Sequence, residues 1–371
     1  MIGAQAGVRK IGASKIGVLR ANGLGDFMFS LPALQALRAA HPAAEIVLLG
    51  REMHRELLEG RPAPVDRVLV LPPIRGVSVP DSQATDGEVA AAAAEALRRE
   101  RFDVTVQLHG GGAHSNPFVA GLGASLTVGL RAPGAEALDL SVPYFYYQPE
   151  VFRYLEVVAL LGASPTGYEP RLAVIDRDLE EAAPVLERLR GRFAVLHPGA
   201  TDARRRWPAE RFAEVGDRLA GAGAAVVVTG TGEERALCGE VVARMRRPAL
   251  DACDQLSLRG LVGLLSRCDV AISNDTGPIH LAAAVGAATV GIFWCGNMVN
   301  GAPLSRTRHR PFPSWQANCP VCGRHASEPR CEHDDSFVTD VRLEEVAEAA
   351  LDLWATEREP VPVRERFKAR S

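Results

Sequence analysis

The stretch IGVLRANGLGDFMFSLPALQAL, residues 16–37, decides the fold. It opens with the mostly aliphatic residues 16–20, which predict a buried strand. A turn containing Gly23 and Gly25 follows, and from Leu31 onward apolar residues recur at the spacing of a helix. A strand, a glycine turn and a helix in this order form the opening unit of an open α/β sheet, in which ligands bind at the carboxyl ends of the strands.

The same alternation of short apolar runs and helical patterns continues along the chain and then restarts. This β-α-β order implies parallel sheets with helices on both faces, and therefore an α/β fold of two successive units. Glycines and prolines within residues 161–190 predict the connection between them. Strands are expected at residues 16–20, 45–49, 67–71, 104–108, 125–129, 193–197, 224–229, 269–273 and 289–293, and helices at residues 90–99, 208–220, 233–245, 258–267, 277–285 and 344–354.

The length and composition are those of a globular protein with two domains. The chain has 371 residues, of which 47% are hydrophobic and 23% charged, and domains commonly contain roughly 100–200 residues. We expect an N-terminal domain at residues 1–170 and a second at residues 171–340. Residues 341–371 then provide a C-terminal helix and a charged tail, whose last residues, 357–371, are expected to fray.

The net charge and the length of the apolar runs exclude several classes of protein. Lysine and arginine total 42 against 45 acidic residues, so no global positive charge favours nucleic acid as a partner. No run reaches the roughly 20 apolar residues that cross a bilayer, and residues 1–15 lack the apolar core of a secretory signal. We therefore expect a cytoplasmic protein, with peripheral association at the inner membrane face left open.

Asp26 is the first candidate functional residue, because it stands where the glycine turn meets the predicted helix. A dinucleotide-binding fingerprint would need a third glycine at the position of Met28, so that fingerprint is excluded. Asp26 is then either a helix N-cap or a general base at the edge of the sheet. The positive end of the helix weakens a carboxylate as a base but keeps it ionised. His109 begins a His-Gly-Gly-Gly loop expected to line the same crevice, since no Gly-x-Ser-x-Gly elbow accompanies it.

Arginines and glycines after two strands of the second half predict an anion site. His197-Pro198-Gly199-Ala200 follows one strand and leads to Arg204-Arg205-Arg206. Guanidinium groups beside a helix start can hold a phosphate in bidentate fashion, although arginine clusters are more often a solvated surface. No P-loop sequence is present, which excludes that class of nucleotide-binding site.

The sequence NDTGPIH, residues 274–280, forms the second junction of this half. Thr276 and Gly277 can donate hydrogen bonds to a diphosphate, and Asp275 either accepts from a ribose hydroxyl or orients the loop. His280 is either a site residue or a buried structural histidine. At a third junction, Glu233 either accepts from a ribose or caps a helix. Asp-Thr-Gly also occurs in aspartic proteases, but those need a pair of such carboxylates in an all-β fold.

The seven cysteines all lie in the second half, and an odd number without a secretory signal is a poor disulfide framework. Four side chains near the C-terminal end have the ligand types that zinc prefers. Their Cys-x2-Cys and Cys-x-His spacing is not that of a standard zinc finger, so reduced thiols are the favoured interpretation and zinc the alternative. These four residues are Cys319, Cys322, Cys331 and His333.

Taken together, these motifs resemble glycosyltransferase family 9, the heptosyltransferases that transfer heptose from ADP-heptose to the inner core of lipopolysaccharide. The resemblance runs from about residue 16 to residue 293 and rests on three segments in the family's order. It implies a GT-B architecture, in which two Rossmann-like domains with parallel sheets face a central cleft. The segments are Gly25-Asp26 with Leu31-Pro32-Ala33-Leu34, His197-Pro198-Gly199-Ala200 with Arg206-Trp207-Pro208, and residues 274–284.

The resemblance also implies a role for each candidate residue. The acceptor would bind the first domain beside Asn22, Gly25 and His109, with Asp26 as the catalytic base. The donor would bind the second domain, where Arg205 takes the place of a residue that is often lysine in relatives. Residues 293–297 replace a simpler Phe-Gly loop, which puts the identity of the donor sugar in question. The implied donor-binding residues are His197, Gly199, Arg205, Glu233, Asp275, Thr276, Gly277 and His280.

The expected reaction is an inverting, metal-independent transfer from a nucleotide-diphosphate sugar to a hydroxyl of a saccharide or lipid-linked saccharide. It requires no cofactor. The alternatives are a non-catalytic protein that binds sugar nucleotides, and an epimerase or phosphorylase of the same fold. An epimerase would change the donor without an acceptor, and a binding protein would not need Asp26.

Overall fold

The computed structural model describes residues 12–80, 87–326 and 328–356, and it divides into two compact units at Pro170 and Arg171. The expected tail at residues 357–371 lies outside the described residues. Unit 1 contains β1 (Lys15–Leu19), α1 (Leu24–Ala40), β2 (Glu45–Gly50), α2 (Glu52–Leu58), β3 (Arg67–Val70), α3 (Gly87–Arg98), β4 (Val104–Gln107), α4 (Ser115–Ala120), β5 (Leu126–Arg131), β6 (Leu140–Pro143) and α5 (Glu150–Ala159).

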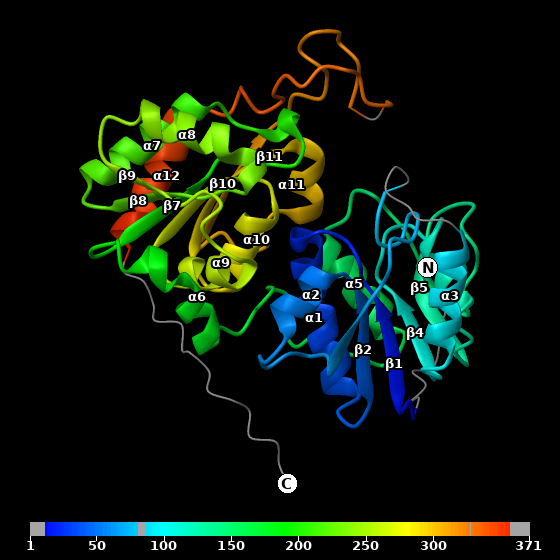
Figure 1. Ribbon diagram of the computed structural model, residues 1–371. Helices are drawn as coiled ribbons and strands as arrows, with labels where there is room; N and C mark the ends of the chain where they lie inside the picture. The colour runs from blue at the N-terminus through cyan, green and yellow to red at the C-terminus, as the bar shows by residue number, and fades with distance from the viewer. Residues whose placement is uncertain (1–11, 81–86, 327, 357–371) are drawn as a thin grey trace. The chain divides into compact units, whose positions relative to one another are not determined.

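Unit 2 repeats this alternation of strands and helices (Figure 1). It contains α6 (Asp176–Leu186), β7 (Phe193–His197), the 3-10 turn η2 (Ala203–Arg205), α7 (Ala209–Gly221), β8 (Ala225–Val228), the 3-10 turn η3 (Gly232–Glu234), α8 (Arg235–Arg244), β9 (Ala249–Asp251), α9 (Leu258–Leu265), β10 (Val270–Asn274), α10 (Gly277–Ala284), β11 (Ala288–Trp294), α11 (Cys295–Gly301), β12 (His309–Ser314) and α12 (Leu343–Ala355).

Both units contain a parallel six-stranded sheet with the same strand order. The order is β3-β2-β1-β4-β5-β6 in unit 1 and β9-β8-β7-β10-β11-β12 in unit 2. This is the doubly wound order, and the direction of winding reverses between β1 and β4 and between β7 and β10. The expected α/β fold with two parallel sheets is confirmed. In such folds the ligand crevice lies at the carboxyl ends of the two central strands, where the winding reverses.

Every strand expected from the sequence is present within two residues of its expected bounds. The sequence did not reveal β6, β9 and β12, which all lie at the edges of the sheets. Central strands are buried on both faces and read as continuous apolar runs, whereas edge strands need no such pattern. β12 has the sequence HRPFPS, and its two prolines are tolerated because an edge strand need not donate every ladder hydrogen bond.

Helices cover both faces of each sheet and complete the cores. In unit 2, α7, α8 and α12 lie on one face and α6, α9 and α10 on the other (Figure 1). α12 buries Val346, Ala350 and Leu353 in the same core as β7 and β10, so it is an integral part of unit 2. Among the described residues, no helix is long and apolar enough to span a membrane.

Candidate functional site

In unit 1 the turn after β1 places Asp26 at the rim of the crevice. The N-cap of α1 is Gly23, and Asp26 is the third residue of the helix rather than its N-cap. The backbone N–H of Gly23 donates to Oδ2 of Asp26 at 3.2 Å, so the carboxylate closes the first turn from inside the helix. The side chain is 42% exposed despite this contact. Asp26 therefore combines a fixed backbone with a carboxylate that solvent and ligands can reach.

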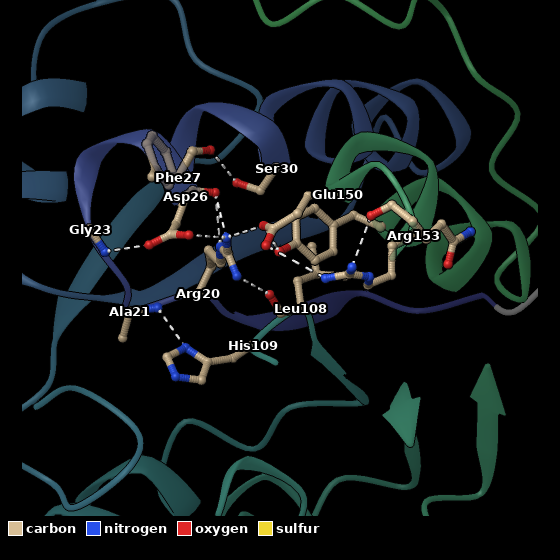
Figure 2. Close-up of polar contacts among 12 residues, drawn as sticks. Arg20, Ala21, Gly23, Asp26, Phe27, Ser30, Leu108, His109, Glu150 and Arg153 are labelled. Atoms are coloured by element: carbon tan, nitrogen blue, oxygen red, sulfur yellow. Dashed lines mark hydrogen bonds and ion pairs between the residues drawn. The ribbon is translucent and has the colours of Figure 1, made fainter. Parts of the chain in front are cut away.

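The buried Arg20 fixes the position of Asp26 through its main chain (Figure 2). Its Nε and Nη2 donate to the carbonyl oxygen of Asp26 at 3.1 and 2.6 Å. Its Nη1 donates to the carbonyl oxygen of Leu108, just beyond β4, at 2.8 Å. Nη2 also lies 3.6 Å from Oδ1 of Asp26. One guanidinium thus joins the ends of both central strands and attracts negative charge to the rim.

Glu150, at the start of α5, balances the charge of Arg20. Its Oε2 lies 2.9 Å from Nη2 of Arg20 (Figure 2). The same oxygen accepts a hydrogen bond from the hydroxyl of Tyr154. The ring of Tyr154 stacks under the guanidinium at 4.6 Å. Burial opposes the charge of Arg20, but Tyr154, Glu150 and Asp26 together raise its pKa above the ordinary value. The arginine therefore stays charged in the interior.

His109 and His54 are neutral imidazoles near this guanidinium. Nδ1 of His109 accepts from the backbone N–H of Ala21 at 3.3 Å. Burial, with the charge of Arg20 and the proximity of His54, lowers the pKa of His109 to about 3. Burial and the charges of Arg20 and Arg51 likewise lower the pKa of His54 to about 3. Both rings are therefore uncharged at neutral pH and offer hydrogen bonds rather than charge.

The remaining acceptor-side candidates belong to the same turn. Gly25 is the second residue of α1, directly before Asp26. Asn22 precedes the N-cap, and its buried Oδ1 has no hydrogen-bond partner in the described part of the chain. The structure thus brings Asn22, Gly25, Asp26 and His109 to one end of the unit 1 sheet.

Arg20 and Glu150 were not predicted from the sequence. An arginine that closes an apolar strand was a usable signal for Arg20, but nothing in the local sequence links Glu150 to it.

In unit 2, Asn274 at the end of β10 joins the loop after β7 to the start of α7. Its Nδ2 donates to the carbonyl oxygen of Pro198 at 2.7 Å, and its Oδ1 accepts from the backbone N–H of Trp207 at 3.0 Å. The side chain is fully buried. Asn274 therefore holds the His197–Ala200 loop against the start of α7, and it has a structural role that the sequence analysis did not assign.

Asp275 is the centre of a buried polar cluster in the same crevice. Its Oδ1 lies 3.0 Å from Nε2 of His280, and its Oδ2 accepts from the amide of Asn297. Nη1 of Arg205 donates to the carbonyl oxygen of Asp275 at 3.1 Å and lies 3.5 Å from Oδ2. Burial opposes ionisation, but the hydrogen bond and charge of His280, with Arg205 and Asn297, hold the pKa of Asp275 below its ordinary value. These contacts favour loop orientation over a direct ribose contact for this residue.

Thr276 and Gly277 begin α10 beside this cluster. Thr276 is the N-cap, no side chain caps the helix, and Pro278 lies in its first turn. The first N–H groups of a helix have no partner within the helix, and its positive end attracts anions. Arg205, on η2, is bound to the residue preceding this N-cap. The structure therefore brings Arg205, Asp275, Thr276, Gly277 and His280 together at the carboxyl end of β10.

The loop after β8 supplies Glu234 rather than Glu233 to the neighbourhood of His197. Glu233 is exposed on η3, whereas a Cβ on Gly199 would lie 2.0 Å from Oε1 of Glu234. Glycine at position 199 is what lets this carboxylate approach the loop. Nδ1 of the buried His197 lies 3.2 Å from Oγ1 of Thr229, and burial lowers the pKa of His197 although Glu234 opposes the shift. A glutamate following Glu233 was visible in the sequence but not singled out.

The four candidate zinc ligands also come together. One potential ligand atom from each of Cys319, Cys322, Cys331 and His333 lies within 4.8 Å of the others. They lie between β12 and α12, in the segment that Figure 1 draws in orange. This cluster is separate from the Asp275 cluster.

Comparison with known proteins relates the chain to one family. The model of glycosyltransferase family 9 (heptosyltransferase) matches residues 90–321. Lipooligosaccharide heptosyltransferase 2 of Campylobacter jejuni subsp. jejuni serotype O:2 is 26% identical over 150 residues, which cover 37% of this chain and 47% of that protein. The homologue from serotype O:6 is 25% identical over 138 residues, or 34% of this chain and 43% of that protein. The chain thus matches about half the length of these curated relatives.

Solved structures share the fold. A glycosyltransferase of family 9 from Veillonella parvula has a TM-score of 0.74 at 19% identity, covering 93% of this chain and 98% of that one. The ADP-heptose lipopolysaccharide heptosyltransferase II of E. coli has a TM-score of 0.68 at 19% identity, covering 92% and 98%. Two Rossmann-like units with this likeness have the GT-B fold, which confirms the expected fold class.

Proposed function

This chain belongs to glycosyltransferase family 9, and we propose that it transfers a heptose from an ADP-heptose-like donor to a hydroxyl of a saccharide or lipid-linked saccharide acceptor. The reaction is inverting and uses Asp26 as its base. Lipopolysaccharide precursors are the acceptor class, and the protein reaches them by peripheral contact with the membrane surface.

Asp26 carries the catalytic part of this proposal. Its carboxylate is 42% exposed at the crevice, while Arg20 holds its carbonyl oxygen at 2.6 Å. A base must be accessible to its substrate and must be held in a fixed orientation. The contacts of Asp26 meet both requirements, since Arg20 fixes its main chain and its carboxylate remains 42% exposed while lying 3.6 Å from the same guanidinium.

The proposed step balances as a direct displacement at the anomeric carbon. The acceptor hydroxyl gives its proton to Asp26 while its oxygen forms a bond to the anomeric carbon. The bond from that carbon to the diphosphate breaks on the opposite face, and its electron pair leaves with the phosphate oxygen. Acceptor binding involves Asn22, Gly25 and His109, whose neutral ring can hydrogen-bond a sugar hydroxyl without adding charge.

The leaving diphosphate is bound by the cluster in unit 2. Arg205 uses Nη1 toward Asp275, and a guanidinium carries five N–H donors in all. The N–H groups of Thr276 and Gly277 add donors that are already oriented, which is the largest source of rate enhancement in such chemistry. His197 and Gly199 border the nucleoside, with Glu234 beside them in place of the exposed Glu233, and His280 acts by positioning Asp275. These groups replace a divalent cation, so added Mg²⁺ should not raise the transfer rate.

The test is the Asp26→Asn variant in the full chain, with Glu52→Gln as a matched control on the exposed surface of unit 1. Loss of a general base should lower turnover by about 10²–10⁴-fold. The thermal shift produced by ADP should stay unchanged in both variants, because the donor binds unit 2. Near-normal transfer by Asp26→Asn would show that the base is another group.

Two further results would identify the alternatives. A protein that is stabilised by ADP sugars but transfers to no saccharide acceptor would be a binding protein. A donor that changes without any acceptor present would indicate an epimerase.

A further inference from the structure

The segment between β12 and α12 contains a tight turn built around two cysteines. The sequence is Cys319-Pro320-Val321-Cys322-Gly323, and the N–H of Gly323 donates to the carbonyl oxygen of Cys319 at 2.9 Å. Gly323 has a φ of +72°, a conformation that other residues rarely adopt. The flanking residues Asn318 and His325 form an antiparallel bridge that closes the turn. Both thiols are therefore held on one rigid loop.

Backbone N–H groups of this loop point at the sulfur atoms. Those of Val321 and Cys322 hydrogen-bond to Sγ of Cys319, and that of Arg324 to Sγ of Cys322. Hydrogen bonds of this kind orient cysteine ligands around a metal ion.

Cys331 and His333 approach this loop from the other side. All four potential ligand atoms lie within 4.8 Å of one another. Four ligands at about 2.3 Å around a tetrahedral zinc lie about 3.8 Å apart, so little movement would bring these atoms onto one ion. Nδ1 of His333 is buried and has no hydrogen-bond partner among the described residues. A buried imidazole nitrogen without a partner is costly unless it binds something.

We propose that Cys319, Cys322, Cys331 and His333 bind one structural zinc ion. Three thiolates and one imidazole are a closed donor set for zinc, with no position left for water. A disulfide would use two of the cysteines and leave the third thiol and the histidine unexplained. The site has no part in the glycosyl transfer step and does not rest on the proposed function.

The segment that contains the four proposed zinc ligands and continues to Phe337 contacts the loop that carries Arg205. Nη1 of Arg330 lies 3.4 Å from Oδ1 of Asp202, and the N–H of Phe337 donates to the carbonyl oxygen of Arg204 at 2.7 Å. The same stretch accepts a hydrogen bond from Nε1 of Trp294 at the carbonyl oxygen of Gln316. Without the ion the segment would have little core of its own, so the residues around Asp202 would lose a rigid neighbour.

The direct test is metal analysis of the full chain, purified without an affinity tag that binds metals. Zinc at about one ion per chain supports the proposal. Iron in place of zinc would overturn the choice of metal, and no bound metal, or a disulfide among these cysteines, would overturn the site itself. This measurement needs no variant and so does not depend on how any variant folds.

Variants then assign the ligands. Cys322→Ser and His333→Ala should each lower the zinc content several-fold, whereas Cys295→Ser, outside the cluster, should leave it unchanged. Cobalt(II) substitution should give the intense visible bands of a tetrahedral thiolate site. Hydrogen exchange at residues 202–206 should speed up in Cys322→Ser; an unchanged rate together with lost zinc would overturn the link to the Arg205 loop.

Discussion

The buried histidines make the stability of this protein depend on pH well above the range where carboxylates titrate. His54 and His109 in unit 1 have pKa values lowered to about 3, and burial with the charges of Arg308, Arg306 and Arg310 lowers the pKa of His309 in unit 2 to about 4. In the unfolded chain each returns to about 6.5. Because the folded-state pKa is the lower one, the stability is fully present above about pH 6.5 and is lost as pH falls.

The loss can be worked out for each ring. A solution at about pH 5 is about 1.5 pH units below the pKa of a histidine in the unfolded chain. Each unit corresponds to about 1.36 kcal/mol, so each buried ring lowers the free energy of unfolding by about 2 kcal/mol. Unit 1 should therefore lose about 4 kcal/mol between about pH 8 and pH 5. His309 alone should cost unit 2 about 2 kcal/mol, and His197, whose pKa is also lowered, adds a loss of the same sign.

Urea unfolding at the two pH values measures this difference separately for each unit. All four tryptophans, Trp207, Trp294, Trp315 and Trp354, belong to unit 2, so their fluorescence follows unit 2 and circular dichroism also follows unit 1. His109→Gln should remove about 2 kcal/mol of the pH-dependent loss in unit 1. His114→Gln, which replaces an exposed histidine of the same unit, should remove none. A unit 1 transition that moves by less than about 1 kcal/mol would refute the reasoning.

Two further predictions concern packing and the buried ion pair. A Cβ on Gly263 would lie 2.1 Å from the carbonyl oxygen of Asp178, so Gly263→Ala should destabilise unit 2 by about 3 kcal/mol in urea unfolding. Gly239→Ala places a Cβ in open space inside α8 and should instead stabilise it by about 0.5–1 kcal/mol; equal effects would contradict the clash. Arg20→Met should cost about 3–5 kcal/mol because Glu150 loses its main counter-charge, and adding Glu150→Leu should recover part of that loss.

The sequence allowed the fold to be predicted because its central strands are buried on both faces. Runs such as residues 193–196 have no polar interruption and lead into a turn that contains Gly199, so the pattern and the architecture coincide. Edge strands such as β12 escaped, since exposure on one side removes the apolar signature. The connection expected within residues 161–190 contains α6, whose burial against α9 depends on contacts that are distant in sequence.

The candidate site was predictable where one loop supplies it and not where several elements meet. Asp275, Thr276 and Gly277 are adjacent, and the structure gathers them with Arg205 and His280. Asn297, which donates to Asp275, comes from α11; it closes the 293–297 segment that the resemblance singled out, but its contact with Asp275 had no local signal. Asp26 is the plainest case: its position was evident from the turn, but Arg20 fixes it together with a glutamate that is remote along the chain.

The order of strands in the sheets has a consequence for how the protein matures on the ribosome. Ile16 pairs with Val104, and Leu196 with Ile272, so each crevice lies between strands that are made far apart in time. At about 5–20 residues per second, the turn bearing Asp26 emerges roughly 4–16 s before β4. Throughout that interval Arg20 lacks the carbonyl oxygen of Leu108 as a hydrogen-bond acceptor. The time needed to translate residues 26–104 therefore sets how long the incomplete sheet of unit 1 depends on chaperones.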